Sequence, residues 1–241
     1  TDARTAKDWG VYFRMRQKHI DLPPSVLWNN QPGVCFHRLP WDYDLDRETK
    51  PTPLFDELFS RVYNAEALKM WIASVFFEKS YCQTYLWING EGGNGKGTLL
   101  RFLEYVFGRS YLSVNPPDPR KPIDNHFFEN FIGKRLITFP DCDNYTFVTT
   151  SEFKALTGGD KVTINPKGKK RFDERIDARY IITSNKKPRI SSQDSDTRRI
   201  IYIEVEKGRK EFGEDYEALL LEEGGDFLIN CIRDYRKAYP T

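Results

Sequence analysis

Hydrophobic residues along the chain follow two patterns. At residues 54–77 they recur with helical spacing, and a shorter stretch of the same kind occupies residues 11–20. Continuous apolar runs stand further along, at residues 84–88 (TYLWI), 135–139 (RLITF), 179–183 (RYIIT) and 200–205 (IIYIEV). Runs of this kind are typical of strands that are buried on both faces of a parallel sheet.

Helical spacing returns between and after these runs, at residues 99–107, 216–221 and 227–235. Alternating strands and helices predict an α/β fold with a mainly parallel central sheet flanked by helices. We expect an N-terminal helical and irregular region, a core, and a C-terminal helical segment, at residues 1–77, 78–206 and 207–241.

A short helix is predicted between the second and third apolar runs. Thr149 and Glu152 stand in the capping-box pattern that opens a helix. Gly158 and Gly159 follow at the position where a helix commonly ends, because glycine adopts the left-handed conformation of a C-terminal cap.

A glycine-rich segment joins the first apolar run to the helix at 99–107. Its residues are Gly90, Glu91, Gly92, Gly93, Asn94, Gly95, Lys96, Gly97 and Thr98. A strand, a glycine-rich turn, a lysine and a helix in this order are what a phosphate-binding P-loop requires, because backbone N–H groups and the helix N-terminus then face the phosphates. We predict that this segment binds the phosphates of ATP, with Lys96 at the β- and γ-phosphates.

The segment departs at one place from the pattern G-x-x-x-x-G-K-[ST]. Gly97 follows the lysine, and the hydroxyl comes one residue later, at Thr98. The Mg²⁺ that accompanies ATP is then expected to be held by Thr98, directly or through water, and by Asp141. The phosphate cradle itself does not depend on that hydroxyl.

Polar residues follow the second and third apolar runs. Asp141 and Asp143 come after residues 135–139, and a carboxylate on a strand next to the loop strand can hold Mg²⁺ and orient the attacking water. Asp141 is the preferred candidate because it lies nearest the strand end, and Asp143 can share the work. Asn185 follows residues 179–183 and is predicted to lie between the γ-phosphate and that water.

Two arginines, Arg198 and Arg199, directly precede the last apolar run. An arginine here is badly placed for its own loop but well placed for the loop of a neighbouring subunit in a ring, where it would stabilise charge on the transferred phosphoryl group. Arg199 is preferred because it abuts the strand, and either arginine fits the role. A surface ion pair is the alternative.

Residues 162–172 (VTINPKGKKRF) contain two extended flanks around a Pro-Lys-Gly turn, which predicts a β-hairpin with a basic tip. Lys167, Lys169 and Lys170 at such a tip suit contacts with nucleic-acid phosphates, without sequence readout. A solvated loop is the alternative for a charge run of this length.

Composition narrows the class of protein only a little. The net charge is +2, so any surface for nucleic acid must be local. The four cysteines form no C-x-x-C pair, which indicates reduced thiols and a cytoplasmic location. No apolar run approaches the length of a membrane span, and we expect no membrane partner. Because the chain opens on Thr1 without an initiator methionine, we expect a fragment of a longer protein.

Four segments together resemble the superfamily 3 helicases, ring-forming ATPases of the AAA+ type, and in particular the primase–helicase branch of phages, large DNA viruses and mobile elements. The similar segments are GEGGNGKGT, HFFENFIGKRLITFPD, FKALTGGD, and TSNKKP followed by Arg198 and Arg199. They stand in the same order and at the same spacing as in that branch, between about residues 82 and 205. Asp141 stands where the family usually has glutamate.

The resemblance implies an AAA+-like P-loop core in a homo-oligomeric ring, usually hexameric, with ATP and Mg²⁺ at subunit interfaces. It implies single-stranded DNA in the central channel and translocation in the 3′ to 5′ direction, with Lys167 and Lys169 on the hairpin that grips the DNA. It also implies a primase or polymerase module in the same full-length chain. The function expected is therefore that of an ATP-dependent DNA helicase module of a replication protein.

Two other functions fit parts of the sequence. A nucleotide kinase is one, because Gly-Lys-Gly-Thr also occurs in adenylate-kinase-like P-loops. Those proteins place the loop near the chain start and need an arginine-rich lid, whereas the loop here begins at Gly90. The other is a nucleotide-gated DNA-binding ring, a platform for a primase or polymerase that unwinds weakly by itself.

Overall fold

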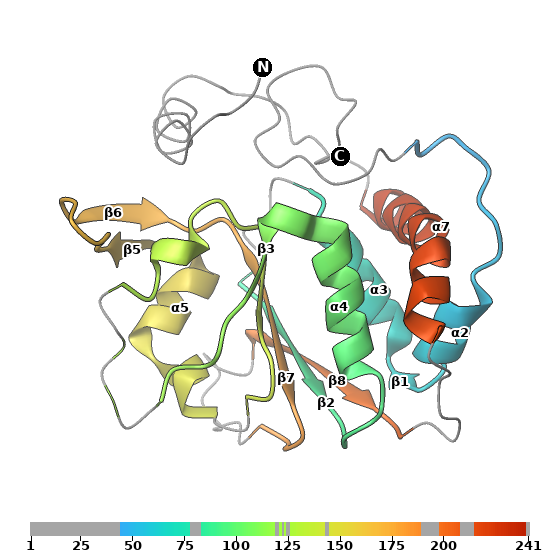
Figure 1. The fold of residues 1–241 in the computed structure, drawn as a ribbon, viewed down its shortest axis with the longest axis horizontal. Coiled ribbons are helices and arrows are strands. Elements are labelled where there is room, and N and C mark those ends of the chain that lie inside the picture. The colour runs from blue at the N-terminus through green and yellow to red at the C-terminus, as the bar shows by residue number, and fades with distance from the viewer. Residues whose placement is uncertain are drawn as a thin grey trace.

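The computed structural model describes residues 44–77, 83–118, 121, 123, 126–142, 145–188, 198–207 and 215–239. Within these ranges a six-stranded sheet has the strand order β1-β8-β2-β7-β4-β3, and a separate two-stranded sheet is made of β5 and β6 (Figure 1). The strands are β1 (Val62–Tyr63), β2 (Tyr85–Asn89), β3 (Tyr111–Ser113), β4 (Leu136–Phe139), β5 (Lys161–Ile164), β6 (Phe172–Arg175), β7 (Arg179–Ser184) and β8 (Ile200–Val205). The α-helices are α2 (Pro53–Phe59), α3 (Ala65–Ser74), α4 (Lys96–Phe107), α5 (Ser151–Gly158) and α7 (Tyr216–Ala238).

The large sheet is mainly parallel. Strand β2 runs parallel to both β7 and β8, and β4 runs parallel to both β7 and β3. Only β1, at one edge of this sheet, pairs in the antiparallel sense, with β8. The predicted α/β class and the predicted parallel sheet are confirmed, because the four apolar runs all form strands of this sheet.

Side chains that alternate along β2 separate two cores. Leu86 and Ile88 face the core that α2, α3, α4 and α7 complete, whereas Tyr85 and Trp87 face a second core with α5 and the β5–β6 hairpin. Figure 1 shows these two groups of elements on opposite sides of the sheet. A continuous apolar strand is required here because both of its faces are buried.

The helical stretch at residues 54–77 is interrupted in the structure. Helix α2 ends at Phe59, strand β1 follows, and α3 begins only at Ala65. Asn64 has a left-handed backbone with φ 63°, and Val62 pairs with Val205 of β8. Sheet pairing and the turn at Asn64 therefore override the apolar periodicity. The predicted helix at 11–20 lies outside the described residues.

The capping residue of α5 also differs from the prediction. The hydroxyl of Thr150, not that of Thr149, accepts a hydrogen bond from the backbone N–H of Phe153 at 3.2 Å. The end of the helix is as expected, because Gly159 is its C-cap with φ 74°.

The C-terminal helix α7 is continuous through two glycines in the middle of its sequence. A Cβ atom added at Gly224 would lie 2.4 Å from Cε2 of Phe102 on α4, whereas one added at Gly225 would meet only Nη2 of Arg47, at 3.7 Å. Gly224 thus permits the close packing of α7 on α4. No helix in the described part of the chain is long and apolar enough to cross a membrane.

These two glycines give a matched pair of stability predictions. We expect Gly224→Ala to lower the free energy of unfolding by about 1–3 kcal/mol, because the ring of Phe102 must move. Gly225→Ala is expected to raise it by up to about 1 kcal/mol, because alanine favours a helix interior and meets no obstacle. Urea denaturation of both variants measures the difference, and equal effects would contradict the packing argument.

Candidate functional site

The glycine-rich loop, residues 90–98, connects the carboxyl end of β2 to the start of α4. Two of its glycines have left-handed backbones, Gly93 with φ 77° and Gly95 with φ 94°. Gly95 is the N-cap of α4, and a Cβ atom added there would lie 2.7 Å from Cδ1 of Leu58. The loop can therefore turn sharply against α2 only with glycine at this position.

Lys96, the first residue of α4, folds its side chain back into the loop. It is only 8% exposed, and its ammonium donates to the backbone oxygens of Gly90 and Glu91, the latter at 3.0 Å. It also reaches Oδ1 of Asn94 at 3.0 Å and Oδ1 of Asn185 at 3.2 Å. The structure thus holds a positive charge at the N-terminus of α4, where an anion is favoured.

Asn94 braces the loop from within. Its side chain is 1% exposed, and Nδ2 donates to the backbone oxygen of Val205, the last residue of β8, at 3.0 Å. A Cβ atom added at Gly90 would lie 1.9 Å from that Nδ2, so this contact requires glycine at position 90. The sequence predicts Asn94 in the phosphate cradle, but it carries no signal for this contact with β8.

Asn185 is brought to the loop by the strand pairing. Ser184 at the end of β7 pairs with Asn89 at the end of β2, and the N–H of Gly90 donates to the Ser184 oxygen at 3.1 Å. Asn185 is the next residue, and it is exposed beside the Lys96 ammonium. Asn185, which was predicted to act at the end of a strand, thus contacts the lysine of the loop directly.

Asp141 lies at the same edge of the sheet but not on the strand next to β2. Strand β7 separates β4 from β2, which places their ends about 10 Å apart. The expectation of a carboxylate on the neighbouring strand is corrected accordingly. Asp141 is exposed, has φ 49°, and its N–H donates to Oγ1 of Thr183 at 3.2 Å. Asp143 lies outside the described residues.

Thr98 and Asp141 are the two oxygen ligands that the sequence predicts for Mg²⁺. The described residues contain no group of three or more His, Cys, Asp or Glu that could hold a metal ion. Thr98 is half-buried on the first turn of α4, with Nη2 of Arg101 3.5 Å from its hydroxyl. A hydroxyl and one exposed carboxylate suit Mg²⁺, which takes its other ligands from phosphate oxygens and water. Residues and cation therefore fit each other only with a phosphate ligand present.

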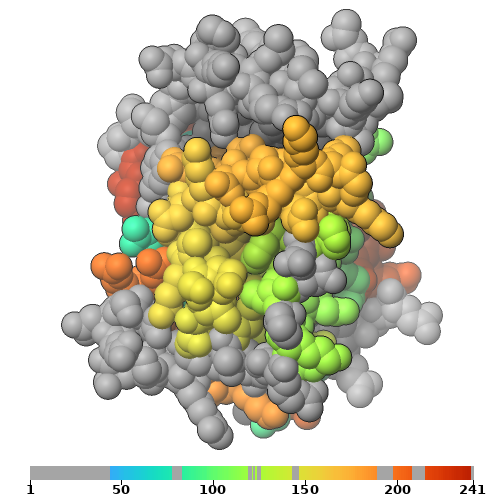
Figure 2. Space-filling model, turned by 90° about the vertical axis from the view of Figure 1, so that its left-hand side faces the viewer, coloured from blue at the N-terminus to red at the C-terminus, as the bar shows by residue number. Residues whose placement is uncertain are grey.

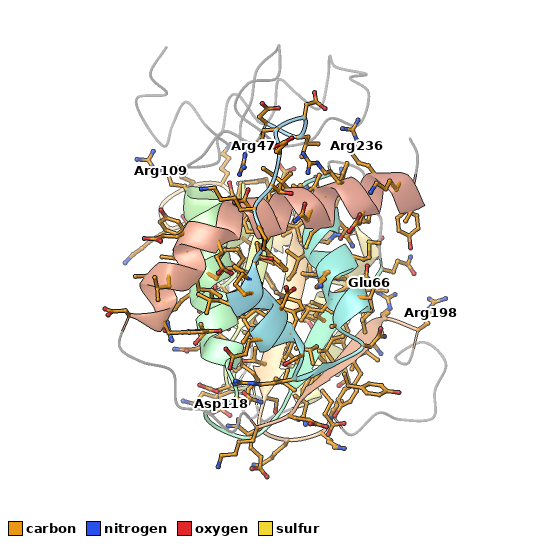
Figure 3. All side chains as sticks on the ribbon, turned by 90° about the vertical axis from the view of Figure 1, so that its right-hand side faces the viewer. Arg47, Glu66, Arg109, Asp118, Arg198 and Arg236 are labelled. Carbon is orange, nitrogen blue, oxygen red and sulfur yellow. The ribbon has the colours of Figure 1, made fainter. Side chains whose placement is uncertain are left out.

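The two arginines lie at the amino ends of the parallel strands, whereas the loop lies at their carboxyl ends. The backbone oxygen of Arg199 accepts from the N–H of Tyr85, which begins β2, and β2 extends about 13 Å from there to the loop. Arg198 is exposed, and Figure 3 shows it projecting away from the body of the molecule at the start of β8. Arg199 is half-buried, and its guanidinium donates to the carbonyl of Lys154 at 3.0 Å and to the hydroxyl of Thr157 at 2.9 Å.

The basic hairpin has the predicted form. Strands β5 and β6 pair in the antiparallel sense from Lys161 with Arg175 to Ile164 with Phe172. The tip contains a turn in which the N–H of Lys169 donates to the Pro166 oxygen at 3.1 Å. The tip lysines are all exposed: Lys167, Lys169 and Lys170. Figure 2 shows the hairpin lying across the surface above α5.

Two further contacts near these elements were missed in the sequence. The guanidinium of Arg135 is buried and donates to the oxygens of Val75 at 3.1 Å and Phe77 at 2.6 Å, which fixes the segment after α3 to the start of β4. Lys187 pairs with Glu204 at 2.9 Å, and the hydrogen bond to this carboxylate raises the pKa of the lysine. Neither contact has a local sequence signal, because the partners are far apart in the chain.

One protein-family model matches the part of the chain that contains these residues. The model of one family, DUF5906, described as a family of unknown function, matches residues 88–199, from β2 to the residue before β8. This span contains the glycine-rich loop, Asp141 and Asn185 at the strand ends, the basic hairpin and the two arginines. No curated protein matches the chain.

Solved structures with a similar fold include those of the C-terminal region of NrS-1. The apo structure of that region (305-718) has a TM-score of 0.62 and 19% identity, over 80% of this chain and 49% of that one. An A form apo structure has a TM-score of 0.60 and 18% identity, over 95% and 60% of the two chains. At such identity the likeness is one of fold, and this chain spans about half to three-fifths of their length.

Proposed function

We propose that this chain is the ATPase module of a DNA replication protein, a helicase of the superfamily 3 type that couples ATP hydrolysis to movement on single-stranded DNA. The observation that carries the proposal is the convergence of Lys96 and Asn185, with their 3.2 Å contact, at the carboxyl edge of a parallel sheet. Ligands of open α/β sheets bind at this edge. The fold that the chain shares with the NrS-1 structures supports the proposal at the level of architecture.

The loop and Lys96 bind the phosphates in this proposal. The oxygens that Lys96 now contacts are neutral backbone and amide groups, and phosphate oxygens replace them as stronger, anionic acceptors. The N–H groups at the start of α4 add their dipoles on the same side. Asn94 keeps the loop in this shape by its contact with β8.

The strand ends then act on the far side of the γ-phosphate. Asn185 is positioned beside Lys96 to hold the γ-phosphate and the attacking water, while Asp141 orients that water and accepts its proton. Mg²⁺, when bound with ATP, would supply positive charge that neutralises the phosphates. Thr98 and Asp141 are the residues that would hold it.

Arg198 is the arginine that we assign to a neighbouring subunit's site. It is exposed, whereas the guanidinium of Arg199 is bonded to α5 of its own chain. Arg198 lies at the amino ends of the strands and the loop lies at their carboxyl ends. One chain therefore cannot bring its own loop and its own Arg198 to the same ATP. The proposal therefore includes a homo-oligomeric ring, expected to be hexameric, with each ATP between two subunits.

The basic hairpin is the proposed contact with DNA. Its exposed tip bears Lys167, Lys169 and Lys170, which form no ion pair within the part of the chain that the structure describes. The hairpin packs on α5 through Val162 and Ile164. Flexible lysines at an exposed tip suit phosphate contacts that do not depend on sequence. The upstream primase or polymerase module expected from the resemblance stays part of the proposal.

ATP hydrolysis with and without single-stranded DNA tests this function. We expect DNA to stimulate the wild-type protein, and Lys167→Ala/Lys169→Ala to remove the stimulation while hydrolysis without DNA stays near the wild-type rate. Lys50→Ala/Lys237→Ala, a double change at exposed lysines elsewhere, is the matched control. The expected loss should also flatten the dependence of DNA binding on salt, because fewer phosphates are contacted.

Two results would count against parts of the proposal. Hydrolysis that is robust but indifferent to DNA would keep the ATPase and remove the translocating motor. Nucleotide-dependent DNA binding without stimulated hydrolysis would instead indicate a DNA-binding platform.

A further inference from the structure

Arg199 joins two elements that are far apart in the sequence. Its Nη1 atom donates both to the Lys154 carbonyl at 3.0 Å and to the Thr157 hydroxyl at 2.9 Å, near the C-terminal end of α5. Thr157 is 6% exposed, so the contact is shielded from water on the helix side. A cation at the C-terminal end of a helix is favoured by the helix dipole as well as by these bonds.

The end of α5 that Arg199 holds leads directly into the basic hairpin. Helix α5 ends at Gly158, Gly159 caps it, and β5 begins at Lys161. The N–H of Asp160 donates to the Ala155 oxygen at 3.0 Å, which leaves little free chain between the helix and the strand. A displacement of the end of α5 is therefore transmitted to the root of the hairpin.

The backbone of Arg199 is attached to the sheet at the same time. Its carbonyl accepts from Tyr85 at the start of β2, and β2 leads to the glycine-rich loop. The preceding residue is the exposed Arg198. Three parts of the molecule thus meet at this position: the exposed arginine, the strand below the loop, and the helix that ends at the hairpin.

We propose that Arg199 is a positioning residue that couples the Arg198 position to the basic hairpin through the C-terminal end of α5. The inference rests on the proposed function, because it gives that motor a connection between the ATP of a neighbouring subunit and the DNA contact. Arg199 itself touches neither ATP nor DNA. When Arg198 moves toward or away from a neighbouring phosphate, the guanidinium of Arg199 carries α5 and the hairpin root with it.

Thr157 offers a matched pair of variants for the test. Thr157→Ser keeps the hydroxyl that accepts from Arg199, whereas Thr157→Val removes it at nearly constant volume. Arg199→Gln removes the guanidinium that donates this hydrogen bond. The measured quantity is the stimulation ratio, the rate of ATP hydrolysis with saturating single-stranded DNA divided by the rate without DNA.

We expect Arg199→Gln and Thr157→Val each to lower this ratio about fivefold or more, with the rate without DNA within about twofold of the wild type. Thr157→Ser is expected to keep the wild-type ratio. The double variant Arg199→Gln/Thr157→Val should be no worse than Arg199→Gln alone, because Arg199→Gln already removes the contact that Thr157→Val removes. A residue that only stabilised the fold would lower both rates together and leave the ratio unchanged, and that result would overturn the proposal.

Hydrogen exchange of the backbone amides separates this inference from the proposed function. We expect faster exchange at residues 158–164 in Arg199→Gln than in Arg198→Ala, whatever the protein hydrolyses. A wild-type protein without DNA-stimulated hydrolysis would overturn the proposed function and, with it, the coupling role. Unchanged exchange at residues 158–164 in Arg199→Gln would overturn the positioning of the hairpin root even if the wild type proves to be a motor.

Discussion

Replacing Lys96 with alanine is expected to lower the rate of ATP hydrolysis about a hundredfold or more, because the variant loses the charge that the structure holds at the start of α4. The ammonium is 8% exposed and is fixed by oxygens of Glu91, Asn94 and Asn185. It therefore lies within the loop before ATP arrives, and it exchanges these neutral oxygens for phosphate oxygens when ATP binds. Steady-state hydrolysis and the affinity for ATP measure the loss.

Two controls separate this effect from a loss of fold. Lys237→Ala removes a lysine whose side chain is 78% exposed, and it should hydrolyse ATP as the wild type does. Thermal unfolding of Lys96→Ala should remain cooperative, because the loop retains the contact of Asn94 with β8. Full activity in a folded Lys96→Ala protein would contradict the assignment of the glycine-rich loop to phosphate binding.

The strands of the large sheet could be predicted because their signal is local. A strand buried on both faces needs apolar residues without interruption, and residues 85–88 of the fully buried strand β2 show this directly. The turn at Gly95 is local as well, since a left-handed residue before a helix favours glycine. For the same reason, the hairpin with its Pro-Lys-Gly turn was visible in the sequence.

Strand order could not be predicted in the same way. Strand β7 lies between β2 and β4, although β4 precedes it in the chain, so Asn185 rather than Asp141 is next to the loop. The order depends on crossovers between distant segments, and no pattern within a strand records it. The interruption of the first helical stretch has a similar cause, because β1 forms only by pairing with β8.

The side-chain partners at the site were the least predictable. The sequence favoured Arg199 over Arg198 because it abuts the strand, whereas the structure bonds Arg199 to Thr157, which lies 42 positions earlier. The bracing of Asn94 by Val205 spans 111 positions. Such contacts follow from packing around the sheet, so the sequence identifies the residue types at the site better than it assigns their individual roles.

Replacing Arg198 with alanine is expected to lower the hydrolysis rate about a thousandfold in the assembled protein, because an arginine supplied by a neighbour stabilises the transferred phosphoryl group. The sharper test is complementation between two inactive variants. Lys96→Ala subunits keep Arg198, and Arg198→Ala subunits keep the loop. Mixing them should restore hydrolysis, because some interfaces then combine an intact loop with an intact arginine.

This restoration depends on the placement of the two groups at opposite edges of one sheet. The backbone of Arg199 meets Tyr85 at the start of β2, while the loop follows Asn89 at its other end, so Arg198 and Lys96 of one chain cannot act on one phosphate. Arg236→Ala, at an exposed position on α7, is the control and should not lower the rate. Sedimentation of each mixture checks that the subunits associate. Associated mixtures without recovered hydrolysis would place the arginine and the loop outside a shared interface.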